Sequence, residues 1–209
     1  MVEGVWGLDG GPVYAWGRQG GVPRVLRFDG AAWTELPTPP GFVVAMHGVA
    51  PDVTFAVGEE GLIARWDGER WTAMESDTDR TLSSVFVADP SRLWICGVRG
   101  DLLEGSIHGV QHVTRSPEAL LAIVWWRDQV WVGTSGELGL CTLDGDRLVS
   151  RKPNLRVTRI DARGELLLSC RDIVACTADG AAFIGSRIAG LRNVLTALEP
   201  PRWQARGRP

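Results

Sequence analysis

The chain has 209 residues, of which 44% are hydrophobic and 22% charged, and its formal net charge is −3. This composition is typical of a single globular domain with a sizeable core, and it excludes an intrinsically disordered chain. Because no long basic or acidic run occurs, the charge pattern argues against nucleic acid and anionic membranes as partners.

The lack of targeting signals in the sequence and the pattern of its cysteines favour a cytoplasmic protein. No apolar stretch reaches the roughly 18–20 residues that span a bilayer, and the N-terminus lacks the basic region and apolar core of a secretory signal. The four cysteines, Cys96, Cys141, Cys170 and Cys176, show neither CxxC spacing nor the density of a disulfide scaffold. We therefore expect small buried thiols in a reducing compartment, an expectation that a removed signal sequence would weaken.

Five segments of the chain repeat one order of parts. Each has an alternating apolar run, a polar turn, a second run ending near Gly, a short loop, a third run, a turn and a short fourth run. The segments cover residues 2–36, 43–74, 82–105, 120–149 and 157–184. Because each apolar run predicts one strand, each repeat of 35–41 residues predicts four strands.

The first predicted strand of every repeat carries an apolar residue at one matched position. These residues are Val5, Met46, Val85, Ile123 and Ile160. Their next neighbours vary from apolar to charged, and they are Trp6, His47, Phe86, Val124 and Asp161. Because side chains alternate across a strand, we expect the first set to wedge between neighbouring units and the second set to face a central channel.

The second predicted strand carries a bulky side chain and ends near a glycine. The bulky residues, which we interpret as packing residues, are Tyr14, Phe55, Trp94, Trp131 and Leu167. The glycines are Gly17, Gly58, Gly97 and Gly133, and Cys170 takes this place in the fifth repeat.

Asp-Gly pairs separate the third and fourth strands in four repeats. They are Asp29-Gly30, Asp67-Gly68, Asp144-Gly145 and Asp179-Gly180. Asp-Gly between alternating runs predicts a hairpin with a type I′ turn. The third repeat offers only Glu104-Gly105 or His108-Gly109, so we expect that unit to be irregular.

Four strands in a unit of about 40 residues match one blade of a β-propeller, whose radial closure removes exposed strand edges. We predict an all-β, five-bladed β-propeller domain over residues 1–190, with a β-solenoid as the alternative. Residues 191–203 align without gaps on residues 82–94, which places Val194 in the wedge column and Trp203 in the bulky column. Residues 191–209 are therefore interpreted as a partial sixth repeat and tail, or as an amphipathic helix with its apolar residues on one face.

The segment AVGEEGLIARWDGERWT resembles the VWAVG-x-x-G-x-I-x-R-[WY]-DG-x-x-W repeat of bacterial propellers related to the photosystem-assembly-factor and BNR groups. The resemblance spans residues 2–190 and is strongest in the first two repeats. It implies a binding protein, because such propellers are mostly scaffolds, assembly factors or parts of adhesins. The sialidase Asp-box S-x-D-x-G-x-T-W is not matched, because here Gly follows Asp directly.

Motifs for catalysis, metals and cofactors are weak. The only tyrosine, Tyr14, lies in the packing column, which argues against sialidase chemistry. His108 and His112 are four residues apart, but no HExxH motif or Cys partner accompanies them. His47 and Asp161 are the only titratable residues of the channel column, too few for a mechanism. We predict no catalytic residues, no metal and no cofactor.

A binding surface is expected where the loops after the second strands and the crossings between blades emerge together. That face would display both signs of charge, which suits a protein or peptide partner. The adjacent residues Trp125 and Trp126 must point in opposite directions, so either one is exposed beside Arg127 or they pack in two core layers. The candidate partner-binding residues are Arg18, Glu59, Glu60, Arg99, Asp101, Trp126, Arg171 and Asp172.

We therefore predict a non-catalytic propeller that binds a protein or peptide, such as a scaffold, an assembly factor or a neutralising, immunity-type partner of another bacterial protein. A lectin-like, glycan-binding propeller is the first alternative, although the loop residues differ between repeats. A hydrolase with a site in the channel is the second. Oligomeric state and the choice between five and six blades stay open.

Overall fold

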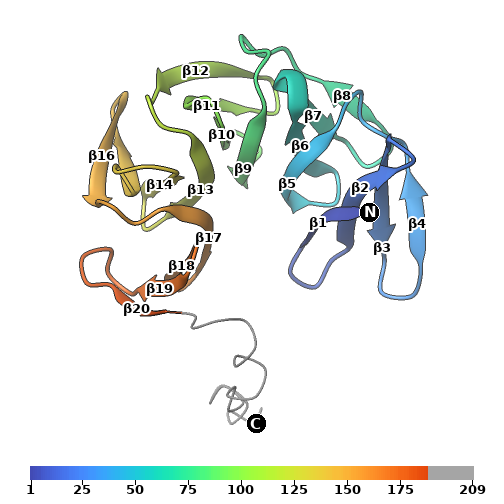
Figure 1. Cartoon of the computed structure of the whole chain (residues 1–209). Helices are drawn as coiled ribbons and strands as arrows, with labels where there is room; N and C mark the ends of the chain where they lie inside the picture. The colour runs from blue at the N-terminus through green and yellow to red at the C-terminus, as the bar shows by residue number, and fades with distance from the viewer. Residues whose placement is uncertain (188–209) are drawn as a thin grey trace.

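The computed structural model describes residues 1–187, which form five four-stranded antiparallel sheets. Figure 1 shows the sheets arranged as blades around an arc, with the first strand of each blade nearest the centre. The predicted all-β propeller with five blades is confirmed for these residues. The partial sixth repeat at residues 191–203 lies outside the described residues.

The strands follow one another within each blade in chain order. Blade 1 contains β1 (Val2–Gly7), β2 (Val13–Gln19), β3 (Val22–Phe28) and β4 (Trp33–Leu36). Blade 2 contains β5 (Val43–Ala50), β6 (Val53–Gly58), β7 (Ile63–Trp66) and β8 (Trp71–Ala73), with the one-turn 3-10 helix η1 (Glu59–Gly61) between β6 and β7. Blade 3 contains β9 (Leu82–Asp89), β10 (Arg92–Gly97), β11 (Asp101–Ser106) and β12 (Gly109–Arg115).

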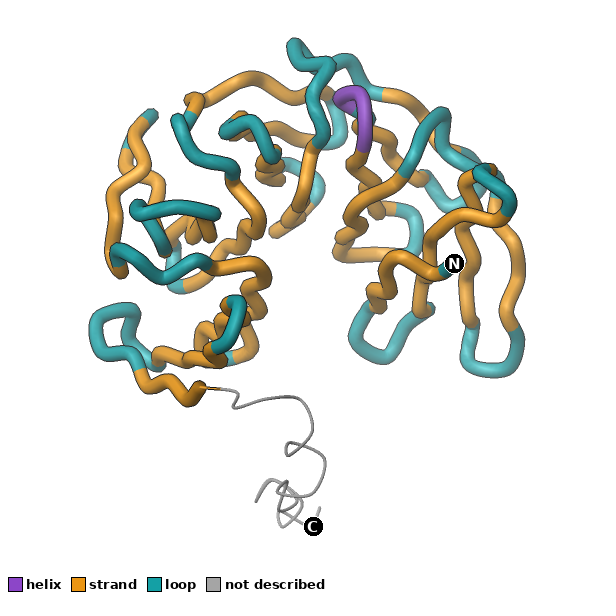
Figure 2. Tube along the Cα trace, viewed as in Figure 1, coloured by secondary structure: helices purple, strands orange, loops and turns teal. Residues whose placement is uncertain are grey.

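The last two blades have the same plan. Blade 4 contains β13 (Leu120–Trp126), β14 (Gln129–Thr134), β15 (Leu140–Asp144) and β16 (Arg147–Lys152). Blade 5 contains β17 (Val157–Arg163), β18 (Glu165–Cys170), β19 (Ile173–Thr177) and β20 (Ile184–Arg187). Figure 2 shows that helix is confined to η1, and within residues 1–187 no helix is long and apolar enough to cross a bilayer.

Each blade has a forward face toward the next blade and a backward face toward the preceding one. The forward face of blade 1 presents Tyr14 and Trp16, which pack on Met46, Ala56 and Ala64 of the backward face of blade 2. The wedge column expected from the sequence thus lies on the backward faces. The bulky column lies on the forward faces, and the alternation of side chains across each strand separates the two sets.

The same pairing of faces repeats along the arc. Phe55, Val57 and Ile63 of blade 2 meet Val85 and Ile95 of blade 3. Equivalent clusters join blade 3 to blade 4 and blade 4 to blade 5. The hydrophobic core therefore consists of four inter-blade layers instead of one central cluster, as expected for radially arranged sheets.

The Asp-Gly hairpins form, but not in the predicted type I′ geometry. Gly30 and Gly68 have φ of 103° and 102°, whereas the aspartates before them are not in the left-handed region. Instead, Asp29 Oδ1 accepts hydrogen bonds from the backbone N–H groups of Ala31 and Ala32, both at 2.9 Å. Asp67 and Asp179 accept equivalent pairs. The carboxylate therefore caps the turn from its first position, which the dipeptide alone did not reveal.

The third blade is more regular than the sequence indicated. It has four paired strands, and a tight turn whose ends are Ser106 and Gly109 joins β11 to β12. His108-Gly109, the second of the two options considered above, therefore closes this hairpin.

Candidate partner-binding face

The loops after the second strands and the crossings between blades share one side of the molecule, here called the loop face. In blade 2 the N–H of Gly61 donates to the carbonyl of Arg80 at 3.0 Å. In blade 3 the N–H of Ser116 donates to Gly100 at 2.8 Å, and in blade 4 that of Asn154 donates to Glu137 at 2.9 Å. These bonds confirm the expected grouping of the loops and tie each one to the crossing that leaves its own blade.

Three glycines make this close contact possible, and sequence reasoning missed them. Gly61, Gly100 and Gly139 all have positive φ, at 70°, 87° and 70°. A Cβ on Gly61 or Gly100 would lie 1.8 or 1.9 Å from a backbone oxygen of the crossing, and one on Gly139 would lie 2.1 Å from the carbonyl oxygen of Lys152, the last residue of β16. Since only glycine fits both restrictions, it allows each loop to lie directly against the neighbouring main chain at these points. The three-residue spacing from Gly58 to Gly61 and from Gly97 to Gly100 was the available signal.

Glu118, in the crossing from blade 3 to blade 4, also binds the loop after the second strand of blade 4. Sequence reasoning missed this residue too. Its Oε2 accepts the hydroxyl of Thr134 at 2.7 Å, and its Oε1 accepts the N–H of Leu138 at 3.1 Å. Desolvation alone would raise the pKa of this carboxyl. The hydrogen bonds from Thr134 and from backbone N–H groups outweigh it, so the pKa is lowered and the group is ionised at neutral pH.

Arg18 and Glu59 lie on the loop face but bind each other. The Arg18 guanidinium donates to Glu59 across the boundary between blades 1 and 2, and its Nε lies 3.0 Å from Glu3. The guanidinium also lies over the Phe42 ring, 3.9 Å from its centroid. These two residues join blades, while Glu60 beside them, with φ of 54°, is exposed.

Asp101 is not displayed on the loop face as expected, because its side chain is fully buried. As the first residue of β11, directly opposite Arg115, it turns inward after the positive-φ Gly100. Arg115 Nη2 lies 2.7 Å from Asp101 Oδ1, His112 Nε2 lies 3.4 Å from the same oxygen, and Arg80 Nη1 lies 3.9 Å from Oδ2. The carboxylate thus binds Arg115 of blade 3 and lies near Arg80 of the crossing before it, and its burial keeps it from touching a partner.

Trp126 is also buried, so its prediction as a partner anchor is wrong. Its indole packs edge to face with Trp131, and its Nε1 donates to the carbonyl of Gly164 in blade 5 at 3.3 Å. Trp125 instead stacks on Trp94 with ring centroids 4.8 Å apart. The two tryptophans therefore occupy different core layers, which was the other interpretation of this pair.

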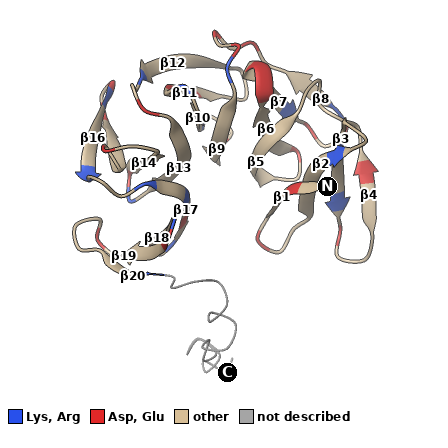
Figure 3. Cartoon of the chain, viewed as in Figure 1, with Lys and Arg blue, Asp and Glu red and all other residues tan. Residues whose placement is uncertain are grey.

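The remaining predicted residues are exposed. Arg99 borders an open cavity of about 640 Å³ that Asp79, Arg80, Thr81 and Val98 also line. Arg171 and Asp172 form the turn between β18 and β19, in the last blade of the arc. Figure 3 shows acidic and basic residues on all five blades. The loop face has mixed charge, because Glu60 and Asp172 are exposed on it together with Arg99 and Arg171.

The channel position His47 is a packing residue. Its ring lies between Trp6 and Phe86, with centroid distances of 5.4 and 4.5 Å, and its Nδ1 accepts the N–H of Val87 at 3.1 Å. Burial lowers the pKa of His47 to about 4, against a small opposing effect of Asp161, so the ring is neutral near pH 7. In the described part of the chain, no three potential ligands gather into a metal site.

No protein-family model matches the chain. A curated relative, the "Immune protein Tsi7" of Pseudomonas aeruginosa, is 31% identical over 159 residues, covering 70% of this chain and 50% of the relative. The chain therefore spans about half the length of that relative.

Solved structures match more of the chain at lower identity. YCF48 bound to D1 peptide has a TM-score of 0.63 at 16% identity and covers 88% of this chain and 66% of its own. The Cps50 (Swd1) β-propeller domain of Myceliophteria thermophila has a TM-score of 0.66 at 12% identity, covering 87% and 69%. At these identities the likeness concerns the fold alone, and that fold is the β-propeller.

Proposed function

We propose that the chain is a non-catalytic binding protein that recognises another bacterial protein through the loop face, in the manner of an immunity protein. The similarity to a relative named an immune protein supports this assignment. The solved propeller YCF48, which is bound to a peptide, supports recognition of a polypeptide by this fold.

The observation that carries the proposal is the construction of the loop face. Backbone hydrogen bonds and glycines hold its loops to the crossings in blades 2, 3 and 4. Each loop nevertheless presents different side chains, such as Glu60, Arg99 and Glu137. A rigid surface with variable, mixed charge favours one specific protein partner, because little conformational entropy is lost on binding.

The same variability argues against the lectin-like alternative. Equivalent sugar pockets would require the same polar and aromatic residues in every blade, and the loops after the second strands do not share them. A glycan array probed with the full chain addresses this alternative directly, since strong binding of one sugar class would favour it.

The test begins with the full chain as bait and the partner that co-purifies with it in stoichiometric amount from the source bacterium. With that partner purified, we expect the Glu60→Lys and Arg99→Glu variants to weaken binding by about tenfold or more each, mainly through charge complementarity. Asp146→Lys, in the turn between β15 and β16 on the opposite side, is the matched control and should leave the Kd unchanged. If the control weakens binding and the loop variants do not, the loop face is not the site.

A further inference from the structure

The forward face of blade 5 carries exposed apolar residues on β18, β19 and β20, beside the charged residues Arg159, Asp161 and Arg163 of β17. No described blade packs on this face. Phe55, Trp94 and Trp131, the bulky residues on the forward faces of blades 2 to 4, are 0%, 4% and 6% exposed. Leu167 occupies the same position in blade 5 and is 42% exposed, and Val174 on the adjacent strand is 47% exposed.

Strand pairing shows that this surface is continuous. Leu167 of β18 lies opposite Cys176 of β19, which in turn lies opposite Ile184 of β20. Facing residues in adjacent strands share one side of a sheet, so these side chains and Val174 form one apolar patch. Asp161, opposite Leu167, and Ser169, opposite Val174, border it. We call Leu167, Val174, Cys176 and Ile184 the seam patch.

The chain continues from this blade with the spacing of another repeat. In the first four blades the crossing to the next blade takes residues 37–42, 74–81, 116–119 and 153–156. The last strand of blade 5 ends at Arg187. A crossing over residues 188–190 would be only one residue shorter than the shortest of these, and the next blade would begin at Leu191.

The sequence at that point has the pattern that opens blades 2 to 5. Each of these begins with two apolar residues three positions apart, namely Val43 and Met46, Leu82 and Val85, Leu120 and Ile123, and Val157 and Ile160. Leu191 and Val194 repeat the pair. In blades 2 to 4 both members are buried in the inter-blade layers.

We propose that residues 191–203 form the first hairpin of a sixth blade and bind to the seam patch of the same chain. Val194 then covers Leu167 and Cys176 as Val85 covers Phe55 between blades 2 and 3. A segment joined by a short connection has an effective concentration on the order of millimolar, which favours it over a second copy of the chain at micromolar concentration.

Cys176 gives a native probe for this contact. It is the only partly exposed cysteine of the four, all of which lie in the described range, and it belongs to the seam patch. We expect N-ethylmaleimide to label Cys176 slowly in the full chain. A chain ending at Arg187, and the full chain carrying Val194→Asp, should both react roughly tenfold faster because local protection is lost.

Leu198→Asp is the matched control. Leu198 aligns with Asp89 of blade 3, so an aspartate at this position is compatible with a blade and should leave Cys176 protected. If the segment were an amphipathic helix instead, Leu198→Asp would expose Cys176 as strongly as Val194→Asp, and this result would overturn the hairpin. Near-UV circular dichroism of each variant establishes that blades 1 to 5 remain folded.

Three further outcomes would overturn the proposal. Equal labelling of the full chain and both variants would mean that residues 191–203 do not cover the patch. Protection that rises with protein concentration and accompanies a dimer in gel filtration would assign the patch to a second copy. Acceleration by Val5→Asp, on the backward face of blade 1, would assign it to closure of the ring by blade 1.

Discussion

Residues at the same position of the repeat are exposed to different degrees in the middle and at the ends of the arc. Met46, Val85 and Ile123, on the backward faces of blades 2 to 4, are 4%, 4% and 3% exposed. Val5, at the same position in blade 1, is 61% exposed, because none of the described blades packs on this face. Residue type at a column position therefore specifies a face of the blade, whereas burial depends on the neighbouring blade, as in other repeat proteins.

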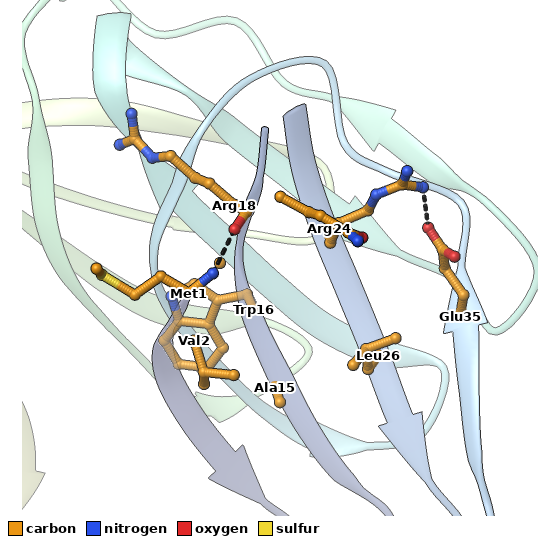
Figure 4. A pocket seen from close by; sticks show the side chains of 10 residues that line it. Met1, Val2, Ala15, Trp16, Arg18, Arg24, Leu26 and Glu35 are labelled. Carbon is orange, nitrogen blue, oxygen red and sulfur yellow. Dashed lines mark hydrogen bonds and ion pairs between the residues drawn. The ribbon is translucent and has the colours of Figure 1, made fainter. Parts of the chain in front are cut away.

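A cavity of about 310 Å³ lies at the end of the arc at blade 1. Val2, Ala15, Trp16 and Leu26 are among the residues that line it, and Figure 4 shows them beside the Arg24–Glu35 ion pair. In blade 2 the positions of Ala15 and Leu26 are Ala56 and Ala64, which lie against Trp16 and Tyr14. Four predictions test this difference between residues packed in the middle of the arc and residues exposed at its ends or in turns.

The largest expected effect comes from truncating one member of a middle layer. Phe55→Ala removes a fully buried ring between blades 2 and 3, and we expect it to lower the free energy of unfolding by about 3–5 kcal/mol. Val5→Ala at the exposed end should cost less than about 0.5 kcal/mol. Urea unfolding followed by tryptophan fluorescence measures both, and equal costs would contradict the contrast between middle and end.

The second prediction concerns acid. His47 titrates near 6.5 when unfolded but at about 4 in the folded chain, so the unfolded state binds the proton first. Stability from the neutral ring is complete above pH 6.5 and is lost as the pH falls toward 4, by about 3 kcal/mol. His47→Gln should flatten the urea midpoint across this window, whereas His108→Gln, at an exposed turn, should not.

The third prediction compares two loop glycines. Gly100→Ala places a Cβ about 1.9 Å from the Ser116 carbonyl oxygen at a φ of 87°, so we expect a loss of about 2–3 kcal/mol. Gly20, with a φ of 58° in blade 1, has no atom within 4 Å of the position that a Cβ would take. Gly20→Ala should therefore cost only the strain of the left-handed backbone, about 1 kcal/mol. Thermal unfolding measures both losses. Equal losses would mean that the close contact of Gly100 with the crossing does not contribute to stability.

The smallest effect is expected at the capped turns. Hydrogen bonds from the N–H groups of Arg70 and Glu69 lower the pKa of Asp67, so its contribution to stability is present above the unfolded pKa and is lost as the pH falls through the folded one. Asp67→Ala should lower the urea midpoint slightly at pH 7 and not at pH 2. A larger difference at the lower pH would contradict the capping role.

Most of the fold could be predicted because each column repeats in every blade. The wedge and bulky columns specify opposite faces of each sheet, and their alternation follows from strand geometry. The candidate site was less predictable. Asp101 follows a glycine in a charged loop sequence, and only the pairing of β11 with Arg115 in β12 reveals that it points inward.

Trp126 illustrates the same limit. Alternation predicted that Trp125 and Trp126 point in opposite directions, and they do. Alternation alone does not predict that both side chains are buried. The layer that buries Trp126 lies between blades 4 and 5 and depends on residues of blade 5, including Gly164. Contacts between residues distant in the sequence therefore set the limit of what could be inferred from the residues alone.

The inter-blade layers also differ in the volumes of their side chains. Because of this difference, each blade packs well only against its own neighbours, which fixes the order of the repeats. Trp16 of blade 1 fits on blade 2 because Ala56 and Ala64 leave room for an indole. Blade 3 presents Ile95 and Leu103 at the corresponding positions. These larger side chains pack against Val57 and Ile63 of blade 2, which are smaller than the Trp16 indole. Exchanging blades 2 and 3 would change three junctions. It would bring Trp16 against two large aliphatic residues, and it would leave a void where Cys96 of blade 3 met Ala56 and Ala64 of blade 2. Successive blades are thus not interchangeable parts, and recombination that shuffles them would be selected against by packing alone.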